Sequence, residues 1–183
     1  MRIIAGEWRR RLLQAPSGDA TRPTADRTRE TLFGMLTSRL GAFEGLRVAD
    51  LFAGSGALGL EALSRGAASC LFVEHDPAAI RALRANIANL RAQQACDVRA
   101  VSVMSLGPAS APYDLILLDP PYGSGAGAVA LDRLRRHGWI GEATWVALET
   151  AYDEKVQLKT LAIESERKVG KAKLTLLRLA DPA

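Results

Sequence analysis

The feature that most restricts the fold is an alternation of short apolar strands with helical segments that begins at residue 47. Short, mostly apolar runs predict strands at 47–51, 70–75, 97–101, 114–118 and 144–149, and helices are predicted at about 58–65, 77–91 and 127–137. Strands that are apolar on both faces are typical of a parallel sheet buried on both sides. The alternation therefore predicts an α/β fold with an open, doubly wound Rossmann-like sheet and right-handed crossovers.

The two ends of the chain depart from this pattern. Residues 1–15 predict a β-hairpin, and a helix is expected at about 26–40. Residues 156–179 predict two strands that pair antiparallel at one edge of an otherwise mostly parallel sheet. The expected organisation is an N-terminal hairpin–helix extension at 1–40 followed by the main α/β domain at 41–183.

An acidic residue and three glycines follow the first strand of the main domain. Asp50 ends this strand, and Gly54, Gly56 and Gly59 form a G-x-G-x-x-G turn that leads into a helix. Such a turn lets a ligand approach the backbone closely, but dinucleotide enzymes share it. A carboxylate ahead of the turn would repel a pyrophosphate, whereas it can hydrogen-bond, directly or through water, near an ammonium group. S-adenosylmethionine carries an ammonium group and no phosphate, so the pattern favours this cofactor.

A second acid, Glu74, ends the next strand. A carboxylate at this position of the sheet can accept hydrogen bonds from both hydroxyls of a ribose. Asp76 is close enough in the sequence to compete for that role. Because Pro77 follows it, Asp76 fits a helix N-cap with proline at the first helical position. We therefore expect Glu74 to bind the cofactor ribose.

An Asp-Pro-Pro-Tyr turn follows the strand at 114–118. Asp119 ends that strand at the sheet edge where open α/β proteins bind ligands, and the two prolines hold the turn rigid and extended. The side chain of Asp119 and the carbonyl of Pro120 can accept the two hydrogens of an exocyclic base amine, whose lone pair is otherwise delocalised into the ring. Tyr122 offers a face on which the base can stack.

The turn therefore predicts methylation of a base amine, with Asp119, Pro120 and Tyr122 as the catalytic residues. After the transfer, Asp119 or water can take the proton that the nitrogen loses. The turn does not distinguish guanine N2 from adenine N6 or cytosine N4. A target base in structured nucleic acid must be unstacked before it reaches this turn.

Further segments narrow the prediction. Residues 2–6 read Arg-Ile-Ile-Ala-Gly, residues 22–33 read Arg-Pro-Thr-Ala-Asp-Arg-Thr-Arg-Glu-Thr-Leu-Phe, and a Gly-Trp pair at 138–139 precedes the closing segment 168–179. Together with the glycine turn and the Asp-Pro-Pro-Tyr turn, they resemble the RsmD family of class I methyltransferases over nearly the whole chain. This resemblance implies methylation of guanine N2 in bacterial 16S ribosomal RNA. It also implies S-adenosylmethionine as cofactor, S-adenosylhomocysteine as product and a 30S assembly particle as the setting.

The resemblance also assigns roles to individual residues. Those expected to contact the cofactor are Asp50, Phe52, Gly54, Gly56, Glu74 and Ser102. The family often has Asp or Asn after the third strand, near the adenine amino group. This chain has Ser102 there, and a serine hydroxyl can still accept a hydrogen bond.

The charge distribution makes the two ends of the chain candidate basic surfaces, and the resemblance implies that the N-terminal end approaches RNA. The formal net charge is +4, which alone is a weak indication of a polyanionic partner. Residues 1–40 contain eight arginines and four acids, whereas every lysine lies at or beyond Lys155. The residues expected to contact RNA are Arg10, Arg22, Arg27 and Arg29. Such contacts make binding sensitive to salt.

The remaining composition indicates no metal centre and no membrane segment. Cys70 and Cys96 form no Cys-x-x-Cys pair, and His75 and His137 are far apart in the sequence, so two free thiols are expected. The start of the chain lacks the apolar core of a signal peptide, and no apolar run approaches transmembrane length. A cytoplasmic location is expected.

Three other functions fit part of the pattern. A DNA amino-methyltransferase shares the motifs, but such enzymes usually carry a sizeable target-recognition region, and 183 residues leave little room for one. A nicotinamide-dependent dehydrogenase is disfavoured by Asp50 and by the Pro-Pro-Tyr turn. A non-catalytic RNA-binding module is disfavoured by the intact glycines and the intact Asp119.

Overall fold

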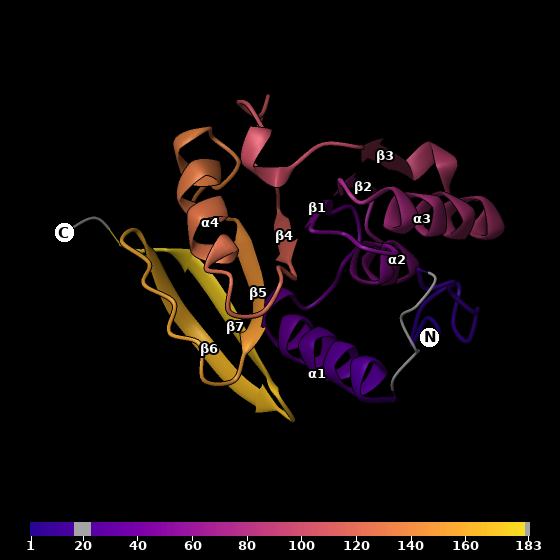
Figure 1. Cartoon of the computed structure of the whole chain (residues 1–183), viewed down its shortest axis with the longest axis horizontal. Helices are drawn as coiled ribbons and strands as arrows, with labels where there is room; N and C mark the ends of the chain where they lie inside the picture. The colour runs from indigo at the N-terminus through magenta and orange to yellow at the C-terminus, as the bar shows by residue number, and fades with distance from the viewer. Residues whose placement is uncertain (17–22, 182–183) are drawn as a thin grey trace.

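The computed structural model describes residues 1–16 and 23–181, and within these it forms one mixed sheet with helices on both faces (Figure 1). The strands are β1 (Arg47–Leu51), β2 (Ser69–Val73), β3 (Cys96–Arg99), β4 (Leu115–Leu118), β5 (Trp145–Ala151), β6 (Leu161–Val169) and β7 (Ala172–Leu179). The helices are α1 (Pro23–Leu40), α2 (Ala57–Ser64), α3 (Pro77–Leu90) and α4 (Ala126–Arg136), with short 3-10 turns at Gln93–Ala95 and Val103–Ser105.

The sheet has the order β3-β2-β1-β4-β5-β7-β6. The first five strands in this order run parallel, whereas β7 pairs antiparallel with both β5 and β6. The order reverses direction next to β1, which is the doubly wound topology that the sequence predicted. The antiparallel pair β6 and β7 forms one end of the sheet (yellow in Figure 1), so the expected antiparallel edge is also confirmed.

Helices pack on both faces of the sheet, and successive residues of each strand point alternately to one face and to the other. Val48 and Leu117 belong to the hydrophobic cluster that includes α1, α2 and α3, whereas Ala49 and Leu118 belong to the cluster that includes α4. All four of these residues are at most 1% exposed. Burial on both faces explains why the central strands are apolar throughout their length.

The N-terminal hairpin is shorter than a pair of regular strands. Its arms meet in one antiparallel bridge between Arg2 and Leu12, supported by hydrogen bonds of 2.9 Å from Ile3 N to the Arg11 carbonyl and from Leu13 N to the Met1 carbonyl. Ile3 and Leu13 are buried in the same hydrophobic cluster as α1 and α2. The extension and the main sheet therefore share one core.

No helix within the described residues is both long enough and apolar enough to cross a membrane. The same residues contain no cluster of histidine, cysteine and acidic side chains suited to a metal ion.

Candidate active site

The strand register places four residues side by side at one edge of the sheet. Val73, Leu51, Leu118 and Leu148 lie in one row across β2, β1, β4 and β5. The residues that follow them in the chain are Glu74, Phe52, Asp119 and Glu149. Three carboxylates thus gather at the carboxyl ends of adjacent parallel strands, where α/β proteins bind their ligands.

The glycine turn between β1 and α2 has one crowded position and one open position. Gly56 has a φ of +85°, and a Cβ atom there would lie 2.4 Å from Cδ1 of Leu83. Gly54 has a φ of +58°, and its missing Cβ would meet no atom within 4 Å. Gly56 therefore permits close packing on α3, whereas Gly54 leaves the turn open to a ligand.

Asp50 is a buried carboxylate with one unused oxygen. The residue is 1% exposed, and its Oδ2 accepts a 2.9 Å hydrogen bond from the amide of Gly59. Its Oδ1 is buried and has no hydrogen-bond partner in the described part of the chain. Burial raises the pKa of Asp50 well above its usual value, against the Gly59 hydrogen bond, and the charges of Asp119 and Glu74 raise it further. An approaching cation would satisfy Oδ1, so the site fits an ammonium-bearing ligand.

Glu74 lies against the glycine turn. Its Oε1 accepts a 2.8 Å hydrogen bond from Gly54 N, and its Oε2 accepts bonds of 2.8 and 2.9 Å from the amides of His75 and Asp76. Asp76 instead caps α3, where its side chain accepts from Ala79 N, so the expected capping role is confirmed. Glu74 is thus the acid that borders the glycine turn.

Phe52 and Ser102, which were also expected to contact the cofactor, follow the carboxyl ends of β1 and β3. Phe52 has a φ of +59°, a conformation that is strained for a phenylalanine and that concentrates at functional sites. Its ring packs on the cluster that contains α4. Ser102 is exposed, and its hydroxyl accepts a 3.2 Å hydrogen bond from Met104 N. That bond leaves the hydroxyl hydrogen free to donate.

Asp119 presents an unengaged carboxylate. The residue is exposed, and within the described residues its side chain accepts no hydrogen bond from the protein. The protein around the carboxyl group nevertheless raises the pKa of Asp119 to about 8, mainly by desolvation and also through the charge of Glu149. The group is therefore suited both to accept hydrogens from an amine and to take up a proton near neutral pH.

Tyr122 is held by an acid that the sequence motifs did not identify. Its hydroxyl donates a 2.5 Å hydrogen bond to Oε1 of Glu149 on β5, while the residue stays 49% exposed. Glu149 ends the buried run Val146–Leu148, just as Asp119 ends Leu115–Leu118. This shared pattern of an acid after an apolar run was the available signal for Glu149.

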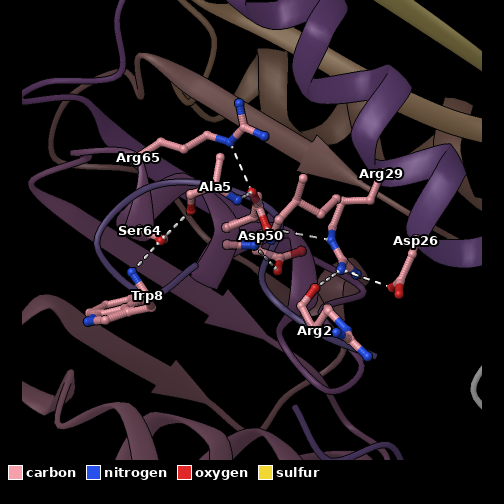
Figure 2. Close-up of polar contacts among 11 residues, drawn as sticks. Arg2, Ala5, Trp8, Asp26, Arg29, Asp50, Ser64 and Arg65 are labelled. Atoms are coloured by element: carbon pink, nitrogen blue, oxygen red, sulfur yellow. Dashed lines mark hydrogen bonds and ion pairs between the residues drawn. The ribbon is translucent and has the colours of Figure 1, made fainter. Parts of the chain in front are cut away.

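Arg29 is buried, whereas an RNA contact was expected to be exposed. Its side chain is 4% exposed, donates to Oδ1 of Asp26 at 3.1 Å and to the carbonyl of Arg2, and lies 3.7 Å from Oε2 of Glu61 (Figure 2). Glu61 is fully buried, and a buried carboxylate requires a cationic partner. Arg29 therefore pairs with a buried acid, and we do not propose it as an RNA contact.

Glu61 also ties the N-terminal segment to α2. Its two oxygens accept hydrogen bonds of 2.9 Å from Ile4 N and 3.0 Å from Ala5 N, and Arg65 donates to it at 3.0 Å. The hydroxyl of Ser64 adds a 2.6 Å bond to the Ala5 carbonyl (Figure 2). The hairpin is thus fixed to the helix that begins at the glycine turn.

Four of the other N-terminal arginines line an open hollow of about 510 Å³. Its lining includes Arg2, Arg9, Arg10 and Arg27, with the acids Asp26 and Glu30. Arg10 and Arg27 are both exposed, as expected for residues that contact RNA. Arg22 lies outside the described residues.

This sheet order, with acids at the ends of β1, β2 and β4 beside a glycine turn, defines a class I methyltransferase. The chain belongs to the family whose model is described as "Conserved hypothetical protein 95", which matches residues 1–178. A relative from Escherichia coli K12, "Ribosomal RNA small subunit methyltransferase D", is 39% identical over 150 residues, which are 82% of this chain and 74% of the relative. The protein of the same name from Haemophilus influenzae is 37% identical over 84% of this chain and 80% of its own length. The resemblance to the RsmD family is thereby confirmed.

Solved structures agree with this assignment. The Escherichia coli structure described as "Putative methyltransferase yhhF" superimposes with a TM-score of 0.86 at 31% identity, covering 100% of this chain and 99% of its own. The methylase HI0767 from Haemophilus influenzae gives a TM-score of 0.79 at 28% identity over 98% of both chains. The magnesium protoporphyrin IX methyltransferase of Synechocystis, solved with bound S-adenosylmethionine, gives a TM-score of 0.66 at 12% identity over 89% of this chain and 87% of its own, which supports the fold alone.

Proposed function

We propose that this protein transfers a methyl group from S-adenosylmethionine to the N2 amine of a guanine in 16S ribosomal RNA. The observation that carries the proposal is the unengaged Asp119 carboxylate, which heads the Asp-Pro-Pro-Tyr turn directly beside the end of the glycine-turn strand β1. The names of the relatives support ribosomal RNA as the substrate. The choice of guanine N2 rests on the resemblance to the RsmD family.

Residues at the ends of β1 and β2 would hold the cofactor. The free Oδ1 of Asp50 would face its ammonium group, directly or through water, and the open backbone at Gly54 would admit its methionine portion. Glu74 would accept hydrogen bonds from the ribose, and Phe52 and Ser102 would border the adenine side. Once bound, the cofactor supplies an electrophilic methyl group on a positively charged sulfur.

Residues 119–122 would hold the target amine. The carboxylate of Asp119 and the carbonyl of Pro120 would accept its two hydrogens, which localises the nitrogen lone pair and directs it. Pro120 is buried, so its carbonyl is held in place by packing as well as by the ring. Positioning of this kind can contribute up to about 7–11 kcal/mol to catalysis. Asp119 or water would then take the proton that the methylated nitrogen loses.

The hollow lined by arginines would bind the RNA backbone. Arg10 and Arg27 are exposed there, and their guanidinium groups suit phosphate oxygens. We keep Arg22 among the proposed contacts because it precedes α1 in the same arginine-rich stretch. The guanine would leave its stack to reach Tyr122, which stabilises it by about 1–3 kcal/mol if it stacks like other aromatic side chains.

A methyl-transfer assay tests the proposal. Tritiated methyl groups from S-adenosylmethionine are offered with immature 30S particles, naked 16S RNA or DNA, and the methylated nucleotide is mapped. We expect transfer to the amino group of a guanine in RNA, lost in Asp119→Ala but retained in Asp132→Ala, which removes an exposed acid of α4. Transfer to DNA alone, or full activity in Asp119→Ala, would contradict the proposal.

A further inference from the structure

We propose that Glu149 is a positioning residue that fixes the ring of Tyr122 beside the amine-binding carboxylate. The inference rests on the function proposed above and adds a residue from β5 to the site. It starts from the register of β4 and β5, which pairs Leu118 with Leu148. The next residues, Asp119 and Glu149, therefore come level, and level residues of neighbouring parallel strands point to the same face of a sheet.

The hydrogen bond between Tyr122 and Glu149 gives this arrangement a function. Its length of 2.5 Å is that of a bond from a hydroxyl to a charged acceptor. A tyrosine ring anchored at its hydroxyl loses its freedom to swing about χ1, while about half of the residue stays exposed. Glu149 would thus fix the tyrosine ring before the base binds. This lowers the free-energy cost of ordering the side chain of Tyr122 on binding.

A second acid supports the same turn from the loop after β5. Oε2 of Glu154 accepts a 3.0 Å hydrogen bond from Gly123 N and a 3.4 Å bond from Ala151 N. The carbonyl of Glu154 accepts a 2.6 Å bond from Nζ of Lys173 on β7. Two consecutive residues of the turn, Tyr122 and Gly123, are therefore tied to β5 and its loop. The ring can only move if this attachment breaks.

The charge of Glu149 also acts on its neighbour. The titratable groups that face Asp119 are Glu149 from β5, Asp50 from β1 and Tyr122 from its own turn. The negative charge of Glu149 raises the pKa of Asp119. Removing that charge therefore lowers the pKa of Asp119, and activity that needs the ionised carboxylate extends to lower pH. A residue that only stabilised the fold would not shift the pH profile.

The experiment compares Tyr122→Phe, Glu149→Ala, Glu149→Gln and the double variant Tyr122→Phe/Glu149→Ala. The exposed acid Glu164 on β6 provides the control Glu164→Ala. We expect Tyr122→Phe and Glu149→Ala each to lower kcat/KM for RNA about tenfold, as for loss of a hydrogen bond to a charged group, with the double variant no worse than either. Glu149→Gln keeps an acceptor for the hydroxyl, so it should recover most of the loss while its pH profile moves to lower pH.

Two further measurements separate this inference from the proposed function. Calorimetric binding of S-adenosylmethionine should be unchanged in every variant. With tyrosine labelled at the ring carbon that bears the oxygen, the NMR signal of Tyr122, assigned through Tyr122→Phe, should shift in Glu149→Ala but little in Glu164→Ala. An unshifted signal, or additive losses in the double variant, would overturn the inference. If the wild-type protein methylates no RNA, and the Tyr122 signal still shifts in Glu149→Ala, the proposed function is refuted. The role of Glu149 in holding the ring is then still supported.

Discussion

The side-chain amide of Asn86 on α3 donates a 2.9 Å hydrogen bond to the carbonyl of Ser55 in the glycine turn. The same nitrogen donates to the carbonyl of Gln14 at 3.0 Å, and Oδ1 accepts from Gln14 N at 2.7 Å. Asn86 is 1% exposed, so water does not replace these bonds. One buried amide thus joins the proposed cofactor turn to the end of the N-terminal segment.

Replacing Asn86 should affect both stability and cofactor binding. Asn86→Ala leaves the carbonyl of Ser55 unpaired in the interior, so we expect the free energy of unfolding in urea to fall by about 1–3 kcal/mol. The affinity for S-adenosylmethionine, measured by calorimetry, should fall as well because the turn loses its support. Asn89→Ala, an exposed position on the same helix, is the control and should change stability by less than about 0.5 kcal/mol. Equal behaviour of the two variants would refute this role.

The hairpin should tolerate no side chain at Gly6. Its φ is +86°, and a Cβ atom there would lie 1.9 Å from the backbone oxygen of Ser64. Gly41 has a similar φ of +75° but an added Cβ would meet nothing within 4 Å. Gly41→Ala should therefore cost only the backbone strain of about 1–2 kcal/mol, whereas Gly6→Ala should cost clearly more because the hairpin must move off α2. Urea unfolding of the two variants measures the difference, and equal losses would show that the contact is unimportant.

Replacing two arginines that lie two positions apart on α1 should affect different properties, stability in one case and RNA binding in the other. Arg29→Ala removes one of the two cations beside the buried Glu61 and leaves Arg65 in place, so we expect it to lower the free energy of unfolding by about 1–3 kcal/mol. Arg27→Ala should leave stability unchanged, weaken RNA binding and reduce the salt slope of the binding constant by about 1. Thermal unfolding and RNA titrations at several salt concentrations test the pair. A stable Arg29→Ala variant with weakened RNA binding would reverse our assignment.

The contribution of Asp119 to stability should fall as the pH rises from about 4 to about 8. The pKa of Asp119 increases from 3.8 in the unfolded chain to about 8 in the folded protein, so the folded state binds more protons between these values. Asp50 and Glu149 also have raised pKa values and act in the same direction. The stabilisation is complete below the unfolded pKa and is lost as the pH passes through the folded one. Unfolding in urea at several pH values should show a shallower decline in Asp119→Asn than in the wild-type protein.

The strands and the acids that end them were accessible from the sequence because each combines a local apolar run with a motif. Asp50, Glu74 and Asp119 were identified in this way. Glu149 was missed, although it also follows an apolar run, because no motif surrounds it. Arg29 was misassigned because its charge does not reveal that its side chain points inward. Its partner Glu61 could not be recognised, since the amides that it accepts from lie 56 and 57 residues away.

This separation has a consequence for synthesis of the chain. The N-terminal segment is synthesised before its partner, because Glu61 follows Ala5 by 56 residues. At about 5–20 residues per second, that interval lasts about 3–11 s. The N-terminal segment therefore cannot form these contacts during this interval, and its docking has to wait until α2 has been made.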